Sequence, residues 1–182
     1  KHEDACRLEY IDVHLVSSPS VTLLQIRNEV ERMAGLVRTN IQLSTSALLS
    51  SRVADAKPIE DNEAVIDYLT DAISDFLVKL NVREMNDGDA QYVNRVFQTL
   101  SDLERIGDYA EKLLHLTEQQ EEKKVVYSAS ALQELAVIND NATQLFDDAV
   151  AGFYRQDVHL DQLKRMAKTQ RQLRKLTNPS QL

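Results

Sequence analysis

The chain has 182 residues and a formal net charge of −8, with 4 glycines, 3 prolines and no tryptophan. This length is enough to bury a core, and the wealth of Leu, Ala, Glu, Gln, Lys and Arg favours helix over sheet. An acidic chain without a basic stripe excludes nucleic acid as the main partner. The single cysteine, Cys6, cannot form an internal disulfide and fits a reducing compartment, and no long apolar run marks a membrane span.

Apolar residues repeat with helical period along five segments of the chain. The first segment begins at Pro19, where Ser18 or Ser20 can cap a helix. Pro58 either opens the second helix in its first turn or forms the corner before it. The stretch of residues 81–89, which contains an Asp-Gly pair, predicts a loop before the third. The predicted helices are 20–56, 59–80, 90–122, 130–155 and 160–176.

The predicted helices come in the order long, shorter, long, long, shorter. This order predicts one unit of three helices, followed by two of the three helices of a second unit. Short connections between helices imply antiparallel neighbours. We therefore expect an all-α, antiparallel helical bundle built from three-helix repeats, the second repeat incomplete. The expected divisions are an extended lead over residues 1–19, a first repeat over 20–124 and a partial second repeat over 125–182.

The third predicted helix carries an acidic stripe. Glu104, Asp108, Glu111 and His115 follow each other at helical spacing, so three carboxylates and an imidazole lie on one face. Carboxylates stacked in this way repel each other, and water, basic neighbours or a bound cation must offset the repulsion. The stripe adjoins a core row that contains Gly107, which costs about 1 kcal/mol in mid-helix and suggests a close helix approach.

The second predicted helix offers another acidic row next to its own apolar face, with Glu63 and Asp67 at its centre and Glu60 and Asp71 at its ends. If the two rows face each other, they can share a cation, because carboxylate oxygens suit hard and borderline metal ions. Glu104 and Asp108 are the predicted metal ligands, and the further candidates are Glu111, Glu63 and Asp67. The alternative is a solvated face, because acidic pairs one turn apart are common in this chain.

A catalytic role is not expected. A ferritin-like di-iron site needs Glu-x-x-His on two helices, whereas Glu111 and His115 are four residues apart and the pattern occurs once. The sequence holds no glycine-rich phosphate loop, nucleophile elbow or Cys-x-x-Cys pair. A carboxylate-bridged metal enzyme therefore stays a minor alternative.

One stretch of the third helix resembles the helix motif of PhoU-type domains: Leu103-Glu104-Arg105-Ile106-Gly107-Asp108-Tyr109-Ala110-Glu111. In that family a Glu/Asp-x-x-x-Asp motif lies in the third helix of each three-helix repeat and can hold metal clusters. The resemblance implies that Glu104 and Asp108 are the motif carboxylates. It also implies that the cofactor is a divalent or ferric ion such as iron, zinc or manganese.

A second segment resembles the start of the PhoU-like cytoplasmic region of bacterial sodium/phosphate cotransporters. It comprises Tyr10-Ile11-Asp12, Leu15, Ser18-Pro19-Ser20-Val21, Glu29 and Glu31-Arg32-Met33. The implied function is a non-catalytic regulatory domain of a sodium-dependent phosphate transporter. The implied partner is the membrane transporter portion of the same protein, which would tether the domain to the cytoplasmic side of the inner membrane.

Two further expectations follow. The second acidic motif of the family would lie in a sixth helix, which the chain does not reach, and the apolar seam left open would favour a homodimer. The alternative function is a helical protein-interaction bundle, a phosphate-signalling regulator without metal.

Overall fold

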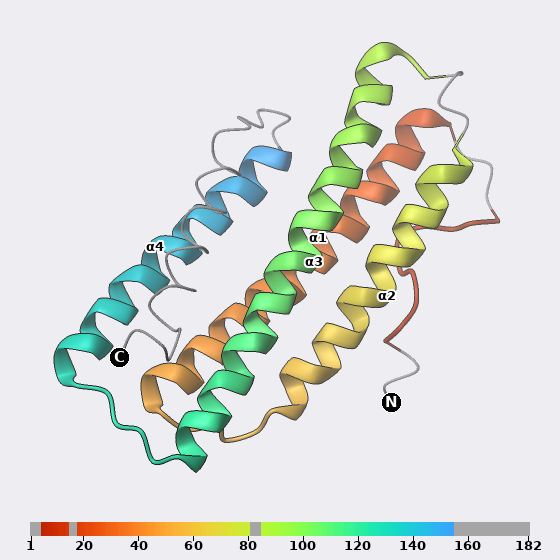
Figure 1. The fold of residues 1–182 in the computed structure, drawn as a ribbon. Helices are drawn as coiled ribbons and strands as arrows, with labels where there is room; N and C mark the ends of the chain where they lie inside the picture. The colour runs from red at the N-terminus through yellow and green to blue at the C-terminus, as the bar shows by residue number, and fades with distance from the viewer. Residues whose placement is uncertain (1–4, 15–17, 81–84, 155–182) are drawn as a thin grey trace. The chain divides into compact units, whose positions relative to one another are not determined.

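The computed structural model describes residues 5–14, 18–80 and 85–154. These residues form four helices and no strand: α1 (Pro19–Ser50), α2 (Lys57–Lys79), α3 (Asp87–Glu122) and α4 (Ala129–Tyr154) (Figure 1). The predicted all-α fold class is therefore confirmed. The predicted fifth helix, residues 160–176, lies outside the described residues, and the predicted domain boundaries stay a prediction.

The first two helices begin where the prolines predict. Ser18 precedes Pro19, the first residue of α1, and its carbonyl oxygen accepts a hydrogen bond from the Thr22 amide at 3.0 Å. Pro58 lies in the first turn of α2, where the missing N–H of proline costs nothing because that donor has no partner inside a helix. The Asp55 carboxylate accepts from the Lys57 amide at 3.0 Å and supports the same turn.

The third helix begins earlier than the sequence predicts. Residues 86–89 were expected to be loop, but α3 starts at Asp87. The Asn86 side-chain oxygen accepts from the Asp89 amide at 2.9 Å, and the Asn86 amide group donates to the Asp89 carboxylate at 2.9 Å. This reciprocal pair caps the helix, so the polar stretch is its N-terminus and not a turn.

The first helix ends at Ser50 and not near residue 56. Ser51 adopts a left-handed conformation with a φ of 51°, and the Arg52 amide donates back to the Ala47 carbonyl at 3.1 Å. This is the hydrogen-bond pattern with which many helices end. Glycine usually occupies the left-handed position. Serine stands there in this chain, so no glycine marks the end of α1.

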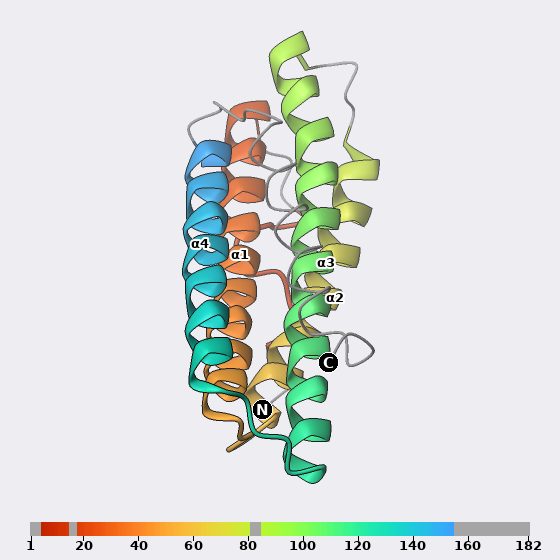
Figure 2. The ribbon, with the colours of Figure 1, turned by 60° about the vertical axis from the view of Figure 1, so that its left-hand side comes forward.

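The helices belong to two compact units. The first comprises Lys1–Asn40 and Asp55–Glu111, and the second Ile41–Ala54 and Lys112–Leu182. In the first unit the early part of α1, α2 and most of α3 lie side by side, and α2 runs antiparallel to the other two (Figures 1 and 2). Of the apolar residues at helical spacing in this unit, Leu23, Phe76 and Leu80 are half-buried. The others are buried: Ile26, Val30, Met33, Val37, Ile59, Ile66, Leu69, Ile73, Val96, Leu100, Leu103 and Ala110.

The second unit brings α4 against the end of α1. The Thr45 hydroxyl donates to the Asn139 side-chain oxygen at 2.8 Å. The Val53 amide donates to the Glu121 carboxylate at 2.9 Å, which attaches the segment after α1 to the end of α3. Along α4 the residues Leu135, Phe146 and Phe153 are buried, and the other predicted core positions are half-buried: Ile138, Ala142, Leu145 and Ala149.

Gly35 offers a test of the first helix. It is an exposed residue in the middle of α1, and a Cβ atom added there would meet nothing within 4 Å. We expect Gly35→Ala to raise the free energy of unfolding by about 1 kcal/mol, because alanine loses less backbone entropy in a helix. Urea unfolding measures this, and a destabilised variant would contradict the placement of Gly35.

Candidate acidic face between α2 and α3

Two acidic rows face each other in the first unit. Asp67 lies one turn after Glu63 on α2, and Glu104, Asp108 and Glu111 follow each other along α3. The negative charges of Asp108 and Glu111 raise the pKa of both α2 carboxyls, so the two rows lie close enough to repel. We call these five residues the acidic face. The sequence predicted each row separately, and the structure brings them together.

Glu63 is the residue on which the two helices meet. It is only 6% exposed. A Cβ atom added to Gly107 of α3 would lie 2.9 Å from Glu63 Oε2 and 3.0 Å from Oε1, closer than atoms in contact normally come. The glycine therefore leaves room for the carboxyl group of the opposite helix, which explains the predicted close approach at this turn.

A small polar network holds one side of the Glu63 carboxyl group. The buried Asn40 side-chain amide donates to Glu63 Oε2 at 3.4 Å and to the Ile59 carbonyl oxygen at 3.1 Å. The Asn62 amide donates to the Asn40 side-chain oxygen at 2.9 Å, which fixes the orientation of the Asn40 amide. Glu63 Oε1 is buried and accepts no hydrogen bond from any residue that the structure describes, an arrangement that is costly for a charged carboxylate.

The surroundings raise the pKa of Glu63 to about 7. Burial is the main cause, followed by the charges of Asp67, Glu111 and Asp108, while the hydrogen bond from Asn40 acts in the opposite direction. A carboxyl group in this setting exchanges its proton near neutral pH.

The pKa values of two other carboxyl groups of the acidic face are also raised. Burial raises the pKa of Asp67, and the Asp108, Glu111 and Asp71 charges raise it further. Burial also raises the pKa of Glu104, with a further rise from Asp108, Asp67 and Asp71. The carboxyl groups of the acidic face therefore lie close enough together for their negative charges to repel one another.

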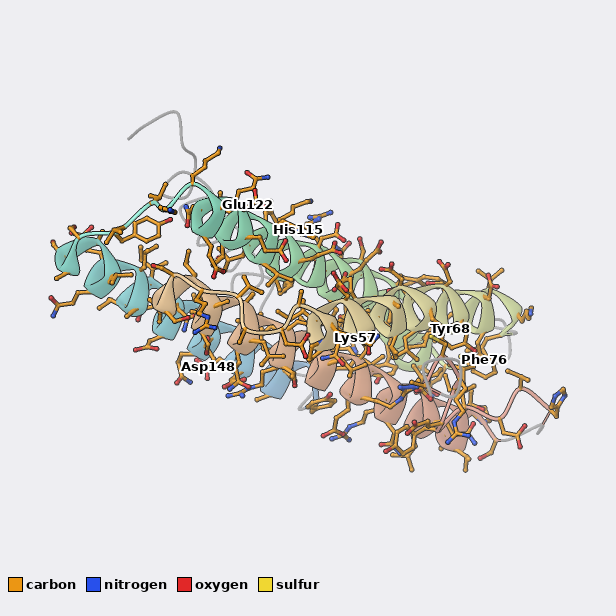
Figure 3. The ribbon with its side chains drawn as sticks, turned by 90° about the horizontal axis from the view of Figure 1, so that it is seen from below. Lys57, Tyr68, Phe76, His115, Glu122 and Asp148 are labelled. Carbon is orange, nitrogen blue, oxygen red and sulfur yellow. The ribbon has the colours of Figure 1, made fainter. Side chains whose placement is uncertain are left out.

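His115, the last residue of the predicted stripe, belongs to the second unit. It lies on the last third of α3 (Figure 3), and its Nδ1 atom is 3.0 Å from Glu118 Oε2 on the same helix. Its side chain is 51% exposed. The nearby carboxylate and the surrounding water account for the imidazole without a metal ion.

The acidic face fits a cation in charge and in donor type. Carboxylate oxygens are the ligands of hard and borderline metal ions, and the bare Glu63 Oε1 is a buried acceptor without a donor. As placed in the described residues, however, no three Asp, Glu, His or Cys side chains form a group that could hold a metal ion. The predicted ligands Glu104 and Asp108 are therefore near other acidic donors, but in no preformed coordination shell.

Two residues of this site escaped the sequence analysis. Asn40 and Asn62 hold the Glu63 carboxyl group in place, yet neither lies in an acidic row. The sequence pattern that could have identified Asn40 is its spacing in α1. Asn40 follows Val37 at helical spacing, so it falls on the core face of the helix. A buried asparagine needs partners, which is an indication of a polar network.

The match to known families covers this site. Residues 30–117, which include all five residues of the acidic face, match the PhoU domain family. This stretch of the chain is therefore similar to a PhoU domain. The chain is also similar to the phosphate-specific transport system accessory protein PhoU of Edwardsiella tarda, with 25% identity over 150 residues. The PhoU accessory protein of Escherichia coli K12 is 25% identical over 161 residues.

The likeness to the PhoU accessory proteins extends beyond the domain match. The alignments cover 82% and 84% of this chain, and 60% and 67% of the Edwardsiella and Escherichia proteins. The chain thus spans roughly two-thirds or less of the length of these relatives. No solved structure matches the chain with significance.

The expected partner is corrected by these relatives. The resemblance to a cotransporter region implied that the partner is the membrane transporter portion of the same protein. The relatives are instead accessory proteins of a phosphate-specific transport system. Among the described helices, none has a stretch long and apolar enough to cross a membrane. The prediction rested on scattered residues between Tyr10 and Met33, whereas the alignments to the accessory proteins cover 82% and 84% of the chain.

Proposed function

We propose that this protein is a non-catalytic, cytoplasmic regulator in phosphate signalling that acts as an accessory to a phosphate transport system. The observation that carries the proposal is the PhoU domain over residues 30–117, together with relatives that are accessory proteins of such a system. The single free cysteine, Cys6, agrees with a reducing compartment. A helical bundle of this kind acts by binding a partner.

Phosphate uptake tests this function. In Escherichia coli cells that lack their own PhoU accessory protein, we expect this chain to restore the uptake rate of radioactive phosphate towards that of the parent strain. A double variant, Glu104→Ala with Asp108→Ala, should fail to restore it if the acidic face is used. Glu118→Ala, which alters an acidic residue of α3 outside the acidic face, is the matched control. Uptake that stays unchanged with the intact, folded chain would contradict the proposal.

We also propose that the acidic face takes up a metal ion, with Glu104 and Asp108 as ligands and Glu111, Glu63 and Asp67 as further donors. The specific support is Glu63 Oε1, a buried acceptor without a donor among the described residues, next to Asp67, Glu111 and Asp108, whose charges raise the pKa of Glu63. A bound iron, zinc or manganese ion would supply the missing positive charge and pin α2 to α3. The opposing alternative is a bundle that binds its partner without metal.

Metal removal separates these alternatives. Protein purified without chelator should contain stoichiometric iron, zinc or manganese by elemental analysis, and EDTA should lower its melting temperature. The variant Glu104→Gln with Asp108→Asn should contain no metal and melt at the same temperature with and without EDTA. Absence of metal in the native protein, with a melting temperature that EDTA does not change, would favour the metal-free bundle.

A further inference from the structure

The segment before α1 is held by a buried carboxylate. Glu29 of α1 is 0% exposed. Its Oε2 atom accepts hydrogen bonds from two successive backbone amides, that of Glu9 at 2.9 Å and that of Tyr10 at 2.7 Å. A carboxylate that accepts two backbone N–H groups is a strong, directional anchor for the chain that supplies them.

Arg32, one turn further along α1, completes the anchor. Its Nε atom donates to Glu29 Oε1 at 2.9 Å, so both oxygens of the carboxylate are used. Its Nη2 atom donates to the carbonyl oxygen of Arg7. The guanidinium group of Arg32 thus neutralises the charge of Glu29. The pair contacts Arg7, Glu9 and Tyr10 through their backbone atoms, and Arg32 Nε also lies 3.8 Å from Glu9 Oε2.

The segment also contacts α2. The Cys6 sulfur lies 3.9 Å from the carbonyl oxygen of Ala64, the residue that follows Glu63 of the acidic face. Ile11 is the one buried residue among the described residues 5–14, at 5% exposure. The segment therefore lies across α1 and α2 of the first unit.

Two features set the stability of this attachment apart from that of the helices. Ile11 is the one buried apolar residue of the described segment 5–14, whereas Tyr10 and Val13 are 47% and 57% exposed, and elements with few buried apolar contacts open most easily. The attached state is nevertheless favoured, because the Glu29 carboxylate loses two hydrogen-bond donors when the segment detaches. An element of this kind has two discrete states, attached and detached.

We propose that residues 6–11 form a strap that opens and closes on the first unit independently of its helices, with the Glu29 carboxylate as its catch. Opening exposes the Glu29–Arg32 pair to water. It also breaks the contact between Cys6 and the Ala64 carbonyl oxygen, so opening of the strap changes the surroundings of α2 next to Glu63. The proposal does not depend on metal binding or on the phosphate-regulating function.

Amide hydrogen exchange on the whole chain tests the strap. In the native protein the Glu9 and Tyr10 amides should exchange faster than the amides in the middle of α2 and α3. Glu29→Gln should speed the exchange of these two amides about tenfold, the loss expected for one charge-assisted hydrogen bond. Rates in the middle of α2 and α3 should stay within twofold. Glu31→Gln, on the exposed side of α1, is the matched control and should change neither set.

Two results would overturn the proposal. Unchanged Glu9 and Tyr10 exchange in Glu29→Gln would mean that the carboxylate is not the catch. Equal rates in the segment and in the helices of the native protein would mean that the segment opens only when the unit unfolds.

A second variant avoids any change in the helices. Tyr10→Pro removes one of the two donated N–H groups at an exposed position, and Val13→Pro is its control outside the anchor. Faster exchange of the Glu9 amide in Tyr10→Pro, with a melting temperature equal to that of Val13→Pro, is the expected result. A parallel loss of protection in the helices of Tyr10→Pro would refute an independent strap.

Discussion

Replacing Glu63 by glutamine should stabilise the protein at pH 8 by about 2 kcal/mol and leave its stability nearly unchanged at pH 5. The pKa of Glu63 is raised from 4.5 to about 7 in the folded protein. At pH 8 the native carboxyl group is ionised, partly desolvated and surrounded by Asp67, Asp108 and Glu111. Glutamine keeps the shape of the side chain and removes this charge.

The sign of the pH dependence follows from proton binding. Between pH 4.5 and about 7 the folded protein keeps the Glu63 proton that the unfolded chain has already released. The free energy of unfolding of the native protein therefore falls as the pH rises through this window, and it does not recover above it. The raised pKa values of Asp67 and Glu104 act in the same direction, upward from the ordinary values of 3.8 and 4.5.

Urea unfolding at pH 5, 6, 7 and 8 measures this dependence, with EDTA present so that no metal ion offsets the charges. The curve of Glu63→Gln should be flatter than that of the native protein. Glu60→Gln, at an exposed position one turn earlier on α2, should run parallel to the native protein. A Glu63→Gln curve parallel to the native one would show that Glu63 is not inside the acidic face.

The variant Gly107→Val should destabilise the protein by roughly 2 kcal/mol, the usual cost of adding side-chain atoms to a filled space. The new Cβ atom alone would lie 2.9 Å from Glu63 Oε2, and the methyl groups need further room. Helix propensity favours valine over glycine by a few tenths of a kcal/mol, which is too little to offset the clash.

A double-mutant cycle isolates the contact between the two helices. In a Glu63→Ala background the space over Gly107 is empty, so Gly107→Val should cost at least 1 kcal/mol less than in the native protein. Gly35→Val, where the new side chain meets no neighbour, is the control for valine in a helix. If the cost of Gly107→Val is the same in both backgrounds, the Glu63 carboxyl group does not lie against this glycine.

Much of the fold follows from local rules. The 3.6-residue period of apolar residues predicts all four described helices and the buried rows of the first three, because a helix must hide its apolar stripe. Ser18, Pro19 and Pro58 predict the helix starts because their effects are local to one turn. The end of α1 escaped prediction because Ser51 takes the left-handed conformation that glycine usually signals.

The acidic face was predictable only in part. Helical spacing places Glu104 and Asp108 on one stripe and Glu63 and Asp67 on another, but which stripes face each other depends on the rotation of packed helices. The partnership of Asn40 with Glu63 joins residues 23 positions apart, and the anchor of Glu29 joins a side chain to backbone amides 19 and 20 positions away. Contacts of this kind come from tertiary packing and leave no period in the sequence.

The most direct test of the acidic face is the titration of the Glu63 carboxyl carbon by NMR, in full-length protein with EDTA present. A carboxyl group packed between α2 and α3 against Gly107 should titrate with a pKa of about 7. A value near 4.5, the ordinary value for glutamate, would contradict the convergence of the two acidic rows on Glu63.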